Sequence, residues 1–260
     1  MHGLGNDFVI VDVRSEPLTV TPRLAKAICD RRIGVGCDQL IVLEQSDTAD
    51  LRMRIWNADG GEVESCGNAS RCVVALTGAT RIETTGGLVL GSAEVGKVQV
   101  TLGQPRFGWD EIPLSFATET GPLPMGWGPL ERPMAVNVGN PHLVFFVDDV
   151  GAIDLGQLGP EIENDPAFPE RINVNVAQVT GSNALTLRTW ERGAGLTLAC
   201  GTGACATAVA AVRLRIAASP VTVTMPGGTL EVGWSPGEPI TMAGDAQHVF
   251  SGTIDLDALA

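Results

Sequence analysis

The sequence predicts a mixed α and β fold that is built from two similar halves. Short segments rich in valine, isoleucine, leucine and threonine alternate with a few alanine-rich stretches, and glycine is frequent, at 32 of 260 residues. One segment of the first half also matches a segment of the second half without a gap. These patterns are typical of strands joined by tight turns, with a small number of helices between them.

Seven segments are predicted to be strands, because β-branched residues fill them and turn-forming residues end them. They are Phe8–Val13, Gln39–Glu44, Leu51–Trp56, Val98–Leu102, Leu143–Val147, Ala184–Trp190 and Val221–Met225. Fewer segments are predicted to be helices. Thr21 and Pro22 are typical of an N-cap and a first helical position, and we expect that helix to continue to Arg32. Two more helices are expected, one after Cys66 and one after Cys200.

The internal match has a constant offset of 134 residues. Leu51–Asn68 and Leu185–Thr202 share six identical residues in eighteen aligned positions, where composition alone gives about one. Outside that window, Gln39 falls on Asn173 at the same offset. Two α/β units related by a pseudo-twofold axis are the simplest structure that explains this repeat.

The stretch richest in proline and glycine, Ala117–Pro133, predicts a linker near the middle of the chain. We expect one domain to comprise residues 1–114 with 246–260 and to carry Cys66. We expect the other domain to comprise residues 115–245 and to carry Cys200.

The charge of the chain argues against nucleic acid or an anionic membrane surface as a partner. Lysine and arginine number 17 and aspartate and glutamate 30, which gives a net charge of −13. Apolar runs such as Leu143–Val147 are too short to cross a bilayer. The first residues show no basic and apolar leader, so we expect a cytoplasmic protein. Six cysteines are too few for a disulfide framework.

Cys66 and Cys200 are the candidate reactive residues. Each precedes the apolar stripe of a predicted helix, where free amides and the helix dipole stabilise a thiolate and lower the thiol pKa. Cys72 and Cys205 lie on those stripes and are expected to be core residues. The alternative for Cys66 and Cys200 is that both are small residues packed in tight strand-to-helix corners. Their equivalent positions in the repeat favour reactive thiols.

A zinc site formed by the same four sulfurs is the second alternative. Five helical positions rotate a side chain by about 500°, so Cys200 and Cys205 do not converge on one ion. The three histidines, His2, His142 and His248, show no ligand spacing either. We therefore expect no metal.

Two thiols brought face to face suit inversion at a carbon that bears an acidic hydrogen. One thiolate removes the proton, and the other thiol delivers a proton to the opposite face of the planar intermediate. Pyridoxal phosphate, the usual electron sink, needs a Schiff-base lysine. Only Lys26 and Lys97 are available, and neither lies in a suitable segment.

We therefore expect no cofactor, and an electrostatic sink for the negative charge instead. The backbone amides of Gly67, Asn68, Gly201 and Thr202, at two helix N-termini, are expected to bind the substrate carboxylate as charge builds on it.

Eight short strings in this order resemble the diaminopimelate epimerase family over nearly the whole chain. They begin at Gly3, Gly34, Asn57, Cys66, Gly139, Arg171, Trp190 and Ala199, and read GLGNDF, GVGCDQ, NADG, CGNASRC, GNPH, RIN, WERG and ACGTG. The resemblance implies a cofactor-independent epimerase of LL- and meso-diaminopimelate, for lysine and cell-wall synthesis, with Cys66 and Cys200 as the catalytic thiols. It also implies two domains, each a curled mixed or antiparallel sheet around a central helix, with the substrate in the cleft between them.

The resemblance also implies which side chains bind the substrate: Asn6, Gln39, Asn57, Asn140, Asn173, Glu191 and Arg192. Amide side chains offer donors and acceptors without adding charge, which suits a substrate with an ammonium and a carboxylate at each end. Arg192 is expected to hold the distal carboxylate, and Glu191 an ammonium. By the same resemblance, His142 and Glu191 assist the thiols. Without it, a loop histidine and a solvated carboxylate are the alternatives.

The chain departs from the family pattern in four places. Its first strand lacks a few residues before His2, and Cys37 stands where a small residue such as alanine is common. Ala69-Ser70 replaces the more usual Gly-Thr after the first catalytic string. Phe250 replaces a tyrosine that is associated with dimerisation, although a homodimer is still expected.

Two other functions fit parts of the pattern. Proline racemases and hydroxyproline epimerases are also two-cysteine enzymes, but they carry a histidine where this chain has Asn68. A non-catalytic module that binds a small molecule or metal would keep the strand-to-helix corners without the chemistry.

Overall fold

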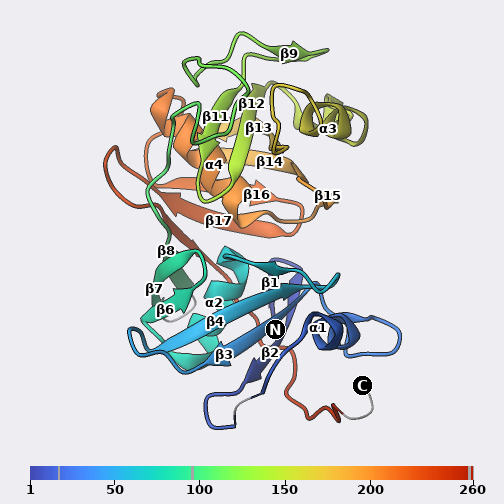
Figure 1. The fold of residues 1–260 in the computed structure, drawn as a ribbon. Helices are drawn as coiled ribbons and strands as arrows, with labels where there is room; N and C mark the ends of the chain where they lie inside the picture. Colours follow the sequence, from blue (N-terminus) through green and yellow to red (C-terminus); the bar gives the residue numbers. More distant parts are fainter. Residues whose placement is uncertain (17, 95–96, 257–258, 260) are drawn as a thin grey trace. The chain divides into compact units, whose positions relative to one another are not determined.

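The computed structural model describes residues 1–16, 18–94, 97–256 and 259. The chain forms two compact units (Figure 1): unit 1 comprises Met1–Thr101 and Ala243–Ala260, and unit 2 comprises Leu102–Met242. The sequence predicts two domains, one of residues 1–114 with 246–260 and one of residues 115–245. That each of them folds independently stays a prediction. Residues 17, 95, 96, 257, 258 and 260 of the first half lie outside the described residues.

Unit 1 contains a mixed sheet in the order β1-β2-β3-β4-β6-β7-β8, and the short β5 pairs with β4. Its strands are β1 (His2–Gly3), β2 (Asn6–Asp12), β3 (Gln39–Glu44), β4 (Leu51–Asn57), β5 (Glu62–Val63), β6 (Arg81–Thr84), β7 (Gly87–Glu94) and β8 (Lys97–Thr101). Its helices are α1 (Pro22–Cys29) and α2 (Gly67–Thr77).

Unit 2 contains a second mixed sheet in the order β17-β16-β14-β13-β12-β11, and β15 pairs with β14. Its strands are β11 (Met134–Asn137), β12 (Pro141–Val147), β13 (Asn173–Gly181), β14 (Ala184–Glu191), β15 (Gly195–Thr197), β16 (Val221–Met225) and β17 (Gly228–Gly233). A separate hairpin joins β9 (Gly126–Trp127) to β10 (Leu130–Glu131). The helices are the 3-10 turn η1 (Val150–Ala152), α3 (Leu155–Glu163) and α4 (Gly201–Arg213). The last strand is β18 (Thr241–Gly244). The chain passes from unit 2 to unit 1 within it, between Met242 and Ala243.

The two sheets repeat one pattern of strand pairing. In unit 1, β2 is parallel to β3, β3 antiparallel to β4, and β4 parallel to β6. In unit 2, β12 is parallel to β13, β13 antiparallel to β14, and β14 parallel to β16. In each unit a short strand, β5 or β15, pairs with the preceding strand and is followed along the chain by one helix, α2 or α4. The predicted mixed fold of two pseudo-symmetric halves is therefore confirmed.

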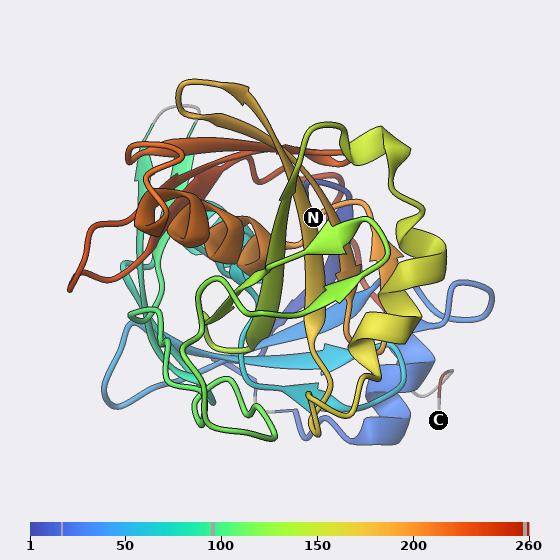
Figure 2. The same cartoon turned by 90° about the horizontal axis from the view of Figure 1, so that it is seen from above.

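Each sheet curls around one helix, α2 in unit 1 and α4 in unit 2. Eight of the eleven residues of α2 and ten of the thirteen residues of α4 are buried. Strands β11 to β14, β16 and β17 all contact α4, which Figure 2 shows in orange. A helix enclosed in this way has almost no solvent-facing side, which explains why small and apolar residues dominate its sequence. No helix in the described part of the chain is long and apolar enough to span a membrane.

All seven predicted strands are present, as β2, β3, β4, β8, β12, β14 and β16, with ends shifted by at most two residues. The predicted start of α1 is also confirmed, because the Thr21 hydroxyl accepts a hydrogen bond from Leu24 N at 3.2 Å. Its predicted end was wrong. The helix stops at Cys29 because Asp30 Oδ1 accepts hydrogen bonds from the amides of Arg32 and Ile33, which bend the chain into a turn.

The linker predicted at Ala117–Pro133 was also wrong. This segment lies inside unit 2 and carries β9 and β10. Its Leu123, Trp127 and Leu130 are buried in the same apolar cluster as Phe145 of β12. Proline and glycine shape a packed loop here, and the apolar residues between them are what hold it on the core.

Helix α3 was not predicted, since Pro160 and two glycines interrupt its pattern. One of these, Gly159, packs against the indole of Trp190 in β14. A Cβ atom at Gly159 would lie 2.4 to 2.8 Å from three ring atoms. Trp190 Nε1 donates to Glu163 Oε2 of the same helix at 2.7 Å, so the ring cannot easily move away. Close approach to the indole therefore requires glycine.

Gly159→Ala tests this packing. Helix propensity alone predicts a gain in the free energy of unfolding of up to about 1 kcal/mol, whereas the overlap with Trp190 predicts a loss of about 1–3 kcal/mol. We expect the loss, measured by urea unfolding. Gly103→Ala is the matched control in unit 2, because no described residue other than its chain neighbours has an atom within 4 Å of the added Cβ. A Gly159→Ala protein at least as stable as the unsubstituted chain would contradict this account.

Candidate functional site

Cys66 lies at the N-cap of α2, where the sequence predicts it. Its backbone is extended, with φ −147° and ψ 111°, and Gly67 begins the helix. The Ser70 amide donates to Cys66 O at 2.9 Å and closes the first turn. The thiol is half-buried, and its Sγ lies 3.9 Å from Asn6 Oδ1 of β2. The first-turn amides and the sulfur therefore occupy the same end of the helix.

A chain of polar side chains surrounds Cys66 in unit 1. Asn68 Nδ2 donates to Asn6 Oδ1 at 3.4 Å, and Asn6 Nδ2 donates to Asp38 Oδ2 at 2.9 Å. Arg71, which is fully buried, donates from Nη2 to Asn68 Oδ1 at 2.9 Å. These bonds set the orientation of both asparagine amides, because each Oδ1 faces a donor.

Gln39 and Asn57 form a second polar pair at the same end of the unit 1 sheet. Gln39 begins β3 and Asn57 ends β4, and the two strands pair them directly. Gln39 Nε2 donates to Asn57 Oδ1 at 2.9 Å. The other end of this amide, Gln39 Oε1, is buried and has no hydrogen-bond partner among the described residues. A buried acceptor of this kind is costly unless a ligand or water satisfies it.

Cys200 lies at the N-cap of α4 and is buried. Its Sγ accepts a hydrogen bond from Gly203 N at 3.3 Å and lies 3.5 Å from Thr202 Oγ1. Burial raises the pKa of the Cys200 thiol well above its ordinary value, and the Glu191 carboxylate raises the pKa further. The Thr202 hydroxyl and Gly203 amide act in the opposite direction but do not compensate. Cys200 therefore carries its proton at neutral pH.

His142, in β12, is fully buried and hydrogen-bonded through both ring nitrogens. Asn175 Nδ2 can only donate, and it lies 3.0 Å from His142 Nδ1, so Nδ1 is the acceptor. Nε2 then carries the hydrogen and donates to Asn140 Oδ1 at 2.8 Å. Burial, with the nearby Arg192 charge, lowers the pKa of His142 to about 3. The ring is therefore neutral at neutral pH and orients Asn140.

Glu191 is the last residue of β14, and Arg192 begins the loop that follows it. Thr197 Oγ1 donates to Glu191 Oε1 at 2.6 Å, which holds the carboxylate on the side of Cys200. The Arg192 amide donates to Asn173 Oδ1 at 2.9 Å, and Asn173 Nδ2 donates to Pro141 O at 2.8 Å. The Asn173 side chain thus links the start of β12, through Nδ2, to the main chain of Arg192, through Oδ1.

Several residues of these networks were missed in the sequence: Asp38, Arg71, Asn175 and Thr197. Asn175 lies two positions after Asn173, on the same face of β13, and strand periodicity signals its place. Asn175 Oδ1 accepts from Thr189 Oγ1 at 3.1 Å, which links β13 to β14 behind His142. Arg71 was signalled by its position as the only charged residue in an otherwise apolar or small helix.

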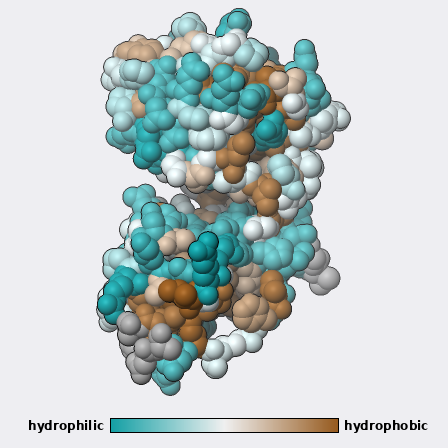
Figure 3. Space-filling model, turned by 90° about the vertical axis from the view of Figure 1, so that its right-hand side faces the viewer, coloured by the Kyte–Doolittle hydropathy of each residue, from teal (hydrophilic) through white to brown (hydrophobic). Residues whose placement is uncertain are grey.

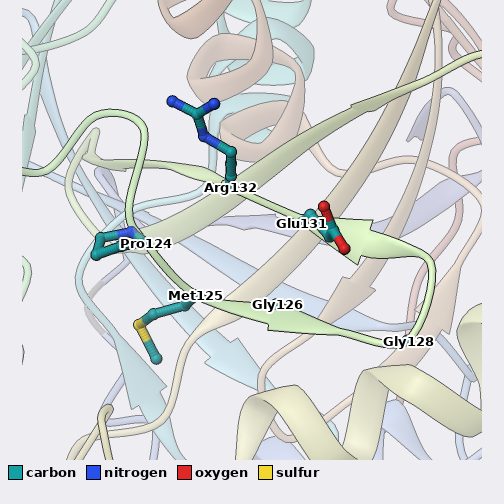
Figure 4. Close-up of a pocket in the computed structure, with 6 residues that line it drawn as sticks. All are labelled: Pro124, Met125, Gly126, Gly128, Glu131 and Arg132. Carbon is teal, nitrogen blue, oxygen red and sulfur yellow. The ribbon is translucent and has the colours of Figure 1, made fainter.

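A surface cavity of about 300 Å³ lies at the β9–β10 hairpin (Figure 4). Its lining residues are Pro124, Met125, Gly126, Gly128, Glu131 and Arg132, none of which is a predicted site residue. In Figure 4 the side chains of Arg132 and Met125 point in opposite directions from the hairpin. The lining of this cavity therefore includes neither Cys66 nor Cys200, and none of the polar side chains described around them.

The sequence matches a family model and many named proteins. The model described as "Diaminopimelate epimerase" matches residues 1–108 and 134–249. Proteins named diaminopimelate epimerase from Sphingopyxis alaskensis and Zymomonas mobilis are 59% and 51% identical to this chain. Each match covers 98% of this chain and 96% of the relative.

Solved structures share the fold at low sequence identity. A probable proline racemase from Agrobacterium radiobacter aligns with a TM-score of 0.65 and 17% identity, over 98% of this chain and 92% of the other. A PhzF-family phenazine biosynthesis protein from Bacillus anthracis aligns with a TM-score of 0.63 and 17% identity, over 94% and 91%. Identities this low indicate a common fold, and the activity needs separate evidence.

The neutral state of His142 predicts a pH dependence of stability. The folded chain keeps this ring neutral down to about pH 3, but the unfolded chain protonates it below its usual pKa of 6.5. The unfolded state therefore binds more protons in that window, and stability falls as pH falls from 6.5 towards 3. In His142→Gln we expect the slope of unfolding free energy against pH to decrease by as much as about 1.4 kcal/mol per pH unit.

Urea unfolding of both proteins between pH 4 and 8 measures the difference. Equal slopes for His142→Gln and the unsubstituted chain would show that the ring is not held neutral.

Proposed function

Because the chain belongs to the diaminopimelate epimerase family, we propose that it interconverts LL- and meso-2,6-diaminopimelate by inverting one α-carbon with Cys66 and Cys200. The observation that carries this proposal is the equivalent placement of the two cysteines, each at the N-cap of an enclosed helix, α2 or α4. The reaction would belong to lysine and peptidoglycan precursor synthesis, and a cytoplasmic location follows from that role.

In the proposed mechanism, the Cys66 thiolate removes the α-hydrogen of the substrate. The electrons of the broken C–H bond remain on the carbon and spread into the carboxylate, and an S–H bond forms on Cys66. The Cys200 thiol then gives its proton to the opposite face of the carbon and is left as the thiolate. The raised pKa of Cys200 supports its role as the proton carrier in this direction. The reverse direction exchanges the two roles. The pair holds one proton at rest, two while the carbon is deprotonated, and one again after the product forms.

The proposed sink for the developing charge is electrostatic. Amides of Gly67 and Asn68 in the first turn of α2, and of Gly201 and Thr202 in α4, have no helical carbonyl partner and favour a bound anion. We expect the substrate carboxylate to accept hydrogen bonds from them as negative charge grows. With only two lysines in the chain, at 26 and 97, a Schiff-base cofactor has few anchoring points.

The remaining predicted residues are proposed to recognise the polar ends of the substrate. The unsatisfied Gln39 Oε1 suits an ammonium group, and Asn57 holds the Gln39 amide in place. Arg192 is proposed to pair with the distal carboxylate, and Glu191 with an ammonium. Asn6 and Asn173 are also proposed to bind the substrate, with their amides oriented by the bonds described above.

His142 is proposed to assist as a positioning residue. Its Nε2–H holds Asn140 Oδ1, which leaves the Asn140 Nδ2 donors for the substrate. Glu191 has a second proposed role beside Cys200, where its negative charge favours the protonated thiol.

We also propose that the chain forms a homodimer. Val249 and Phe250 support this, because they are 61% and 66% exposed, unusual for large apolar side chains. Sedimentation should show a dimer at micromolar concentration, and a monomer there would contradict it.

Solvent-isotope exchange tests the proposed chemistry. In D₂O with a reductant present, the unsubstituted chain should incorporate deuterium at the α-carbon of diaminopimelate. Cys66→Ser and Cys200→Ser should each slow inversion by about 100-fold or more, because a serine hydroxyl is a far weaker acid than a thiol. Cys72→Ala, a control in the core of α2, should retain exchange. No exchange with the unsubstituted chain would overturn the proposed function.

Gln39→Met tests the proposed ammonium contact. Loss of this acceptor should raise KM by about 10- to 100-fold, with a smaller change in kcat. Gln45→Met is the matched control, because exposed Gln45 contacts only Arg14 O in the hydrogen bonds of the described chain. If both substitutions leave KM unchanged, Gln39 does not bind the substrate.

A further inference from the structure

A second pair of cysteines lies close together in unit 1 and takes no part in the proposed chemistry. Cys29 ends α1, and Cys37 lies two residues before β3. Their Sγ atoms are 3.4 Å apart, and the Cys37 amide donates to Cys29 O at 3.2 Å. Both side chains are buried, at 2% exposure. The main-chain bond and the thiol contact together hold the two residues side by side.

The pair needs little movement to become a disulfide. A disulfide bond is about 2.05 Å long, so the sulfurs must approach by about 1.3 Å. The hydrogen bond between the main chains already holds the two backbones next to each other. Side-chain rotation is therefore the main adjustment.

We propose that Cys29 and Cys37 form an oxidisable dithiol, which a small hydroperoxide converts into an intramolecular disulfide. In the first step, Cys29 sulfur attacks a peroxide oxygen, the O–O bond breaks and Cys29 becomes a sulfenic acid. In the second step, Cys37 sulfur attacks Cys29 sulfur, the S–O bond breaks and water leaves with the Cys37 proton. With hydrogen peroxide, two thiols lose two electrons and two protons in total, and two waters form.

The contacts of the pair favour Cys29 as the attacking sulfur. The Cys37 thiol donates a hydrogen bond to Cys29 Sγ, which lowers the pKa of Cys29, and the positive charge of Arg31 acts in the same direction. The same contact, together with burial, raises the pKa of Cys37. One sulfur is thus favoured as the thiolate while its neighbour keeps the proton that leaves with water.

The loop between the two cysteines, which carries exposed apolar side chains, is the proposed route for the peroxide. Ile33 and Val35 are 79% and 40% exposed, although both are large apolar residues. Figure 3 shows the side of unit 1 on which α1 and this loop lie, with apolar surface exposed there. Two glycines let the loop fold back over the helix end. A Cβ atom on Gly34 would lie 2.1 Å from Ala27 O, and Gly36 has φ +81°. The loop between the cysteines is therefore held against the end of α1 while its apolar side chains remain exposed.

The dithiol also adjoins the polar network of unit 1. Asp38, next to Cys37, accepts hydrogen bonds from Asn6 Nδ2 and Arg31 Nη2, both at 2.9 Å. Gln39 follows it directly. A disulfide at Cys37 would therefore fasten the turn from which this network extends. The relevance of that turn to substrate binding rests on the proposed function, but formation of the bond does not.

Peptide mapping tests the proposal on the full chain. The unsubstituted chain and a Cys66→Ala/Cys200→Ala variant are treated with hydrogen peroxide, alkylated under denaturing conditions and digested with trypsin. Cleavage after Lys26, Arg31, Arg32 and Arg52 leaves Cys29 in peptide 27–31 and Cys37 in peptide 33–52. We expect these two peptides as one linked species, lighter than their sum by two hydrogens, which a reductant separates.

The linked species should form at equal rates in both proteins, since the proposed catalytic thiols take no part. Cys72→Ala, which removes a different buried thiol, should leave its yield unchanged, and Cys37→Ser should abolish it. Recovery of both peptides only in alkylated form, after peroxide treatment that oxidises Cys66 or Cys200, would overturn the proposal. That result needs no Cys37 variant to fold, and it leaves the epimerase proposal unaffected.

Discussion

A cysteine at the N-cap of an enclosed helix is the constraint on which both halves of the candidate site depend. The first turn of α2 or α4 leaves backbone amides without helical partners, and the cap places one sulfur beside them. Small residues along each helix allow the surrounding strands to approach closely, so the cap has little freedom to shift. The proposed acid–base group and the proposed anion site are thus set by one local feature of the backbone.

The internal repeat places one such cap in each unit, and the surroundings of the two caps differ. Cys66 is half-buried, and its side chain makes no capping hydrogen bond. Cys200 is buried, accepts a hydrogen bond from Gly203 N and faces Glu191. In the proposed acid–base pair, these differences favour Cys200 as the thiol that carries the shared proton at rest.

The sequence predicted what local patterns determine. Strands followed from β-branched residues, the start of α1 from Thr21-Pro22, and both cysteine caps from the repeat. Features set by tertiary contacts were missed. Gly159 in α3 is explained only by the indole that packs on it, and Arg71 and Asn175 only by partners distant in sequence. The end of α1 and the packed segment 117–133 depended on side-chain contacts that composition does not reveal.

The claim that two different thiols act on opposite faces of one carbon is tested most directly by where deuterium appears at early times. Unlabelled LL-diaminopimelate is converted in D₂O, and substrate and product are separated at low conversion. The account predicts deuterium at the inverted carbon of the product and none in recovered substrate, because one sulfur takes the hydrogen and the other gives deuterium. Equal labelling of both pools, or product without deuterium, would indicate a single base and contradict it.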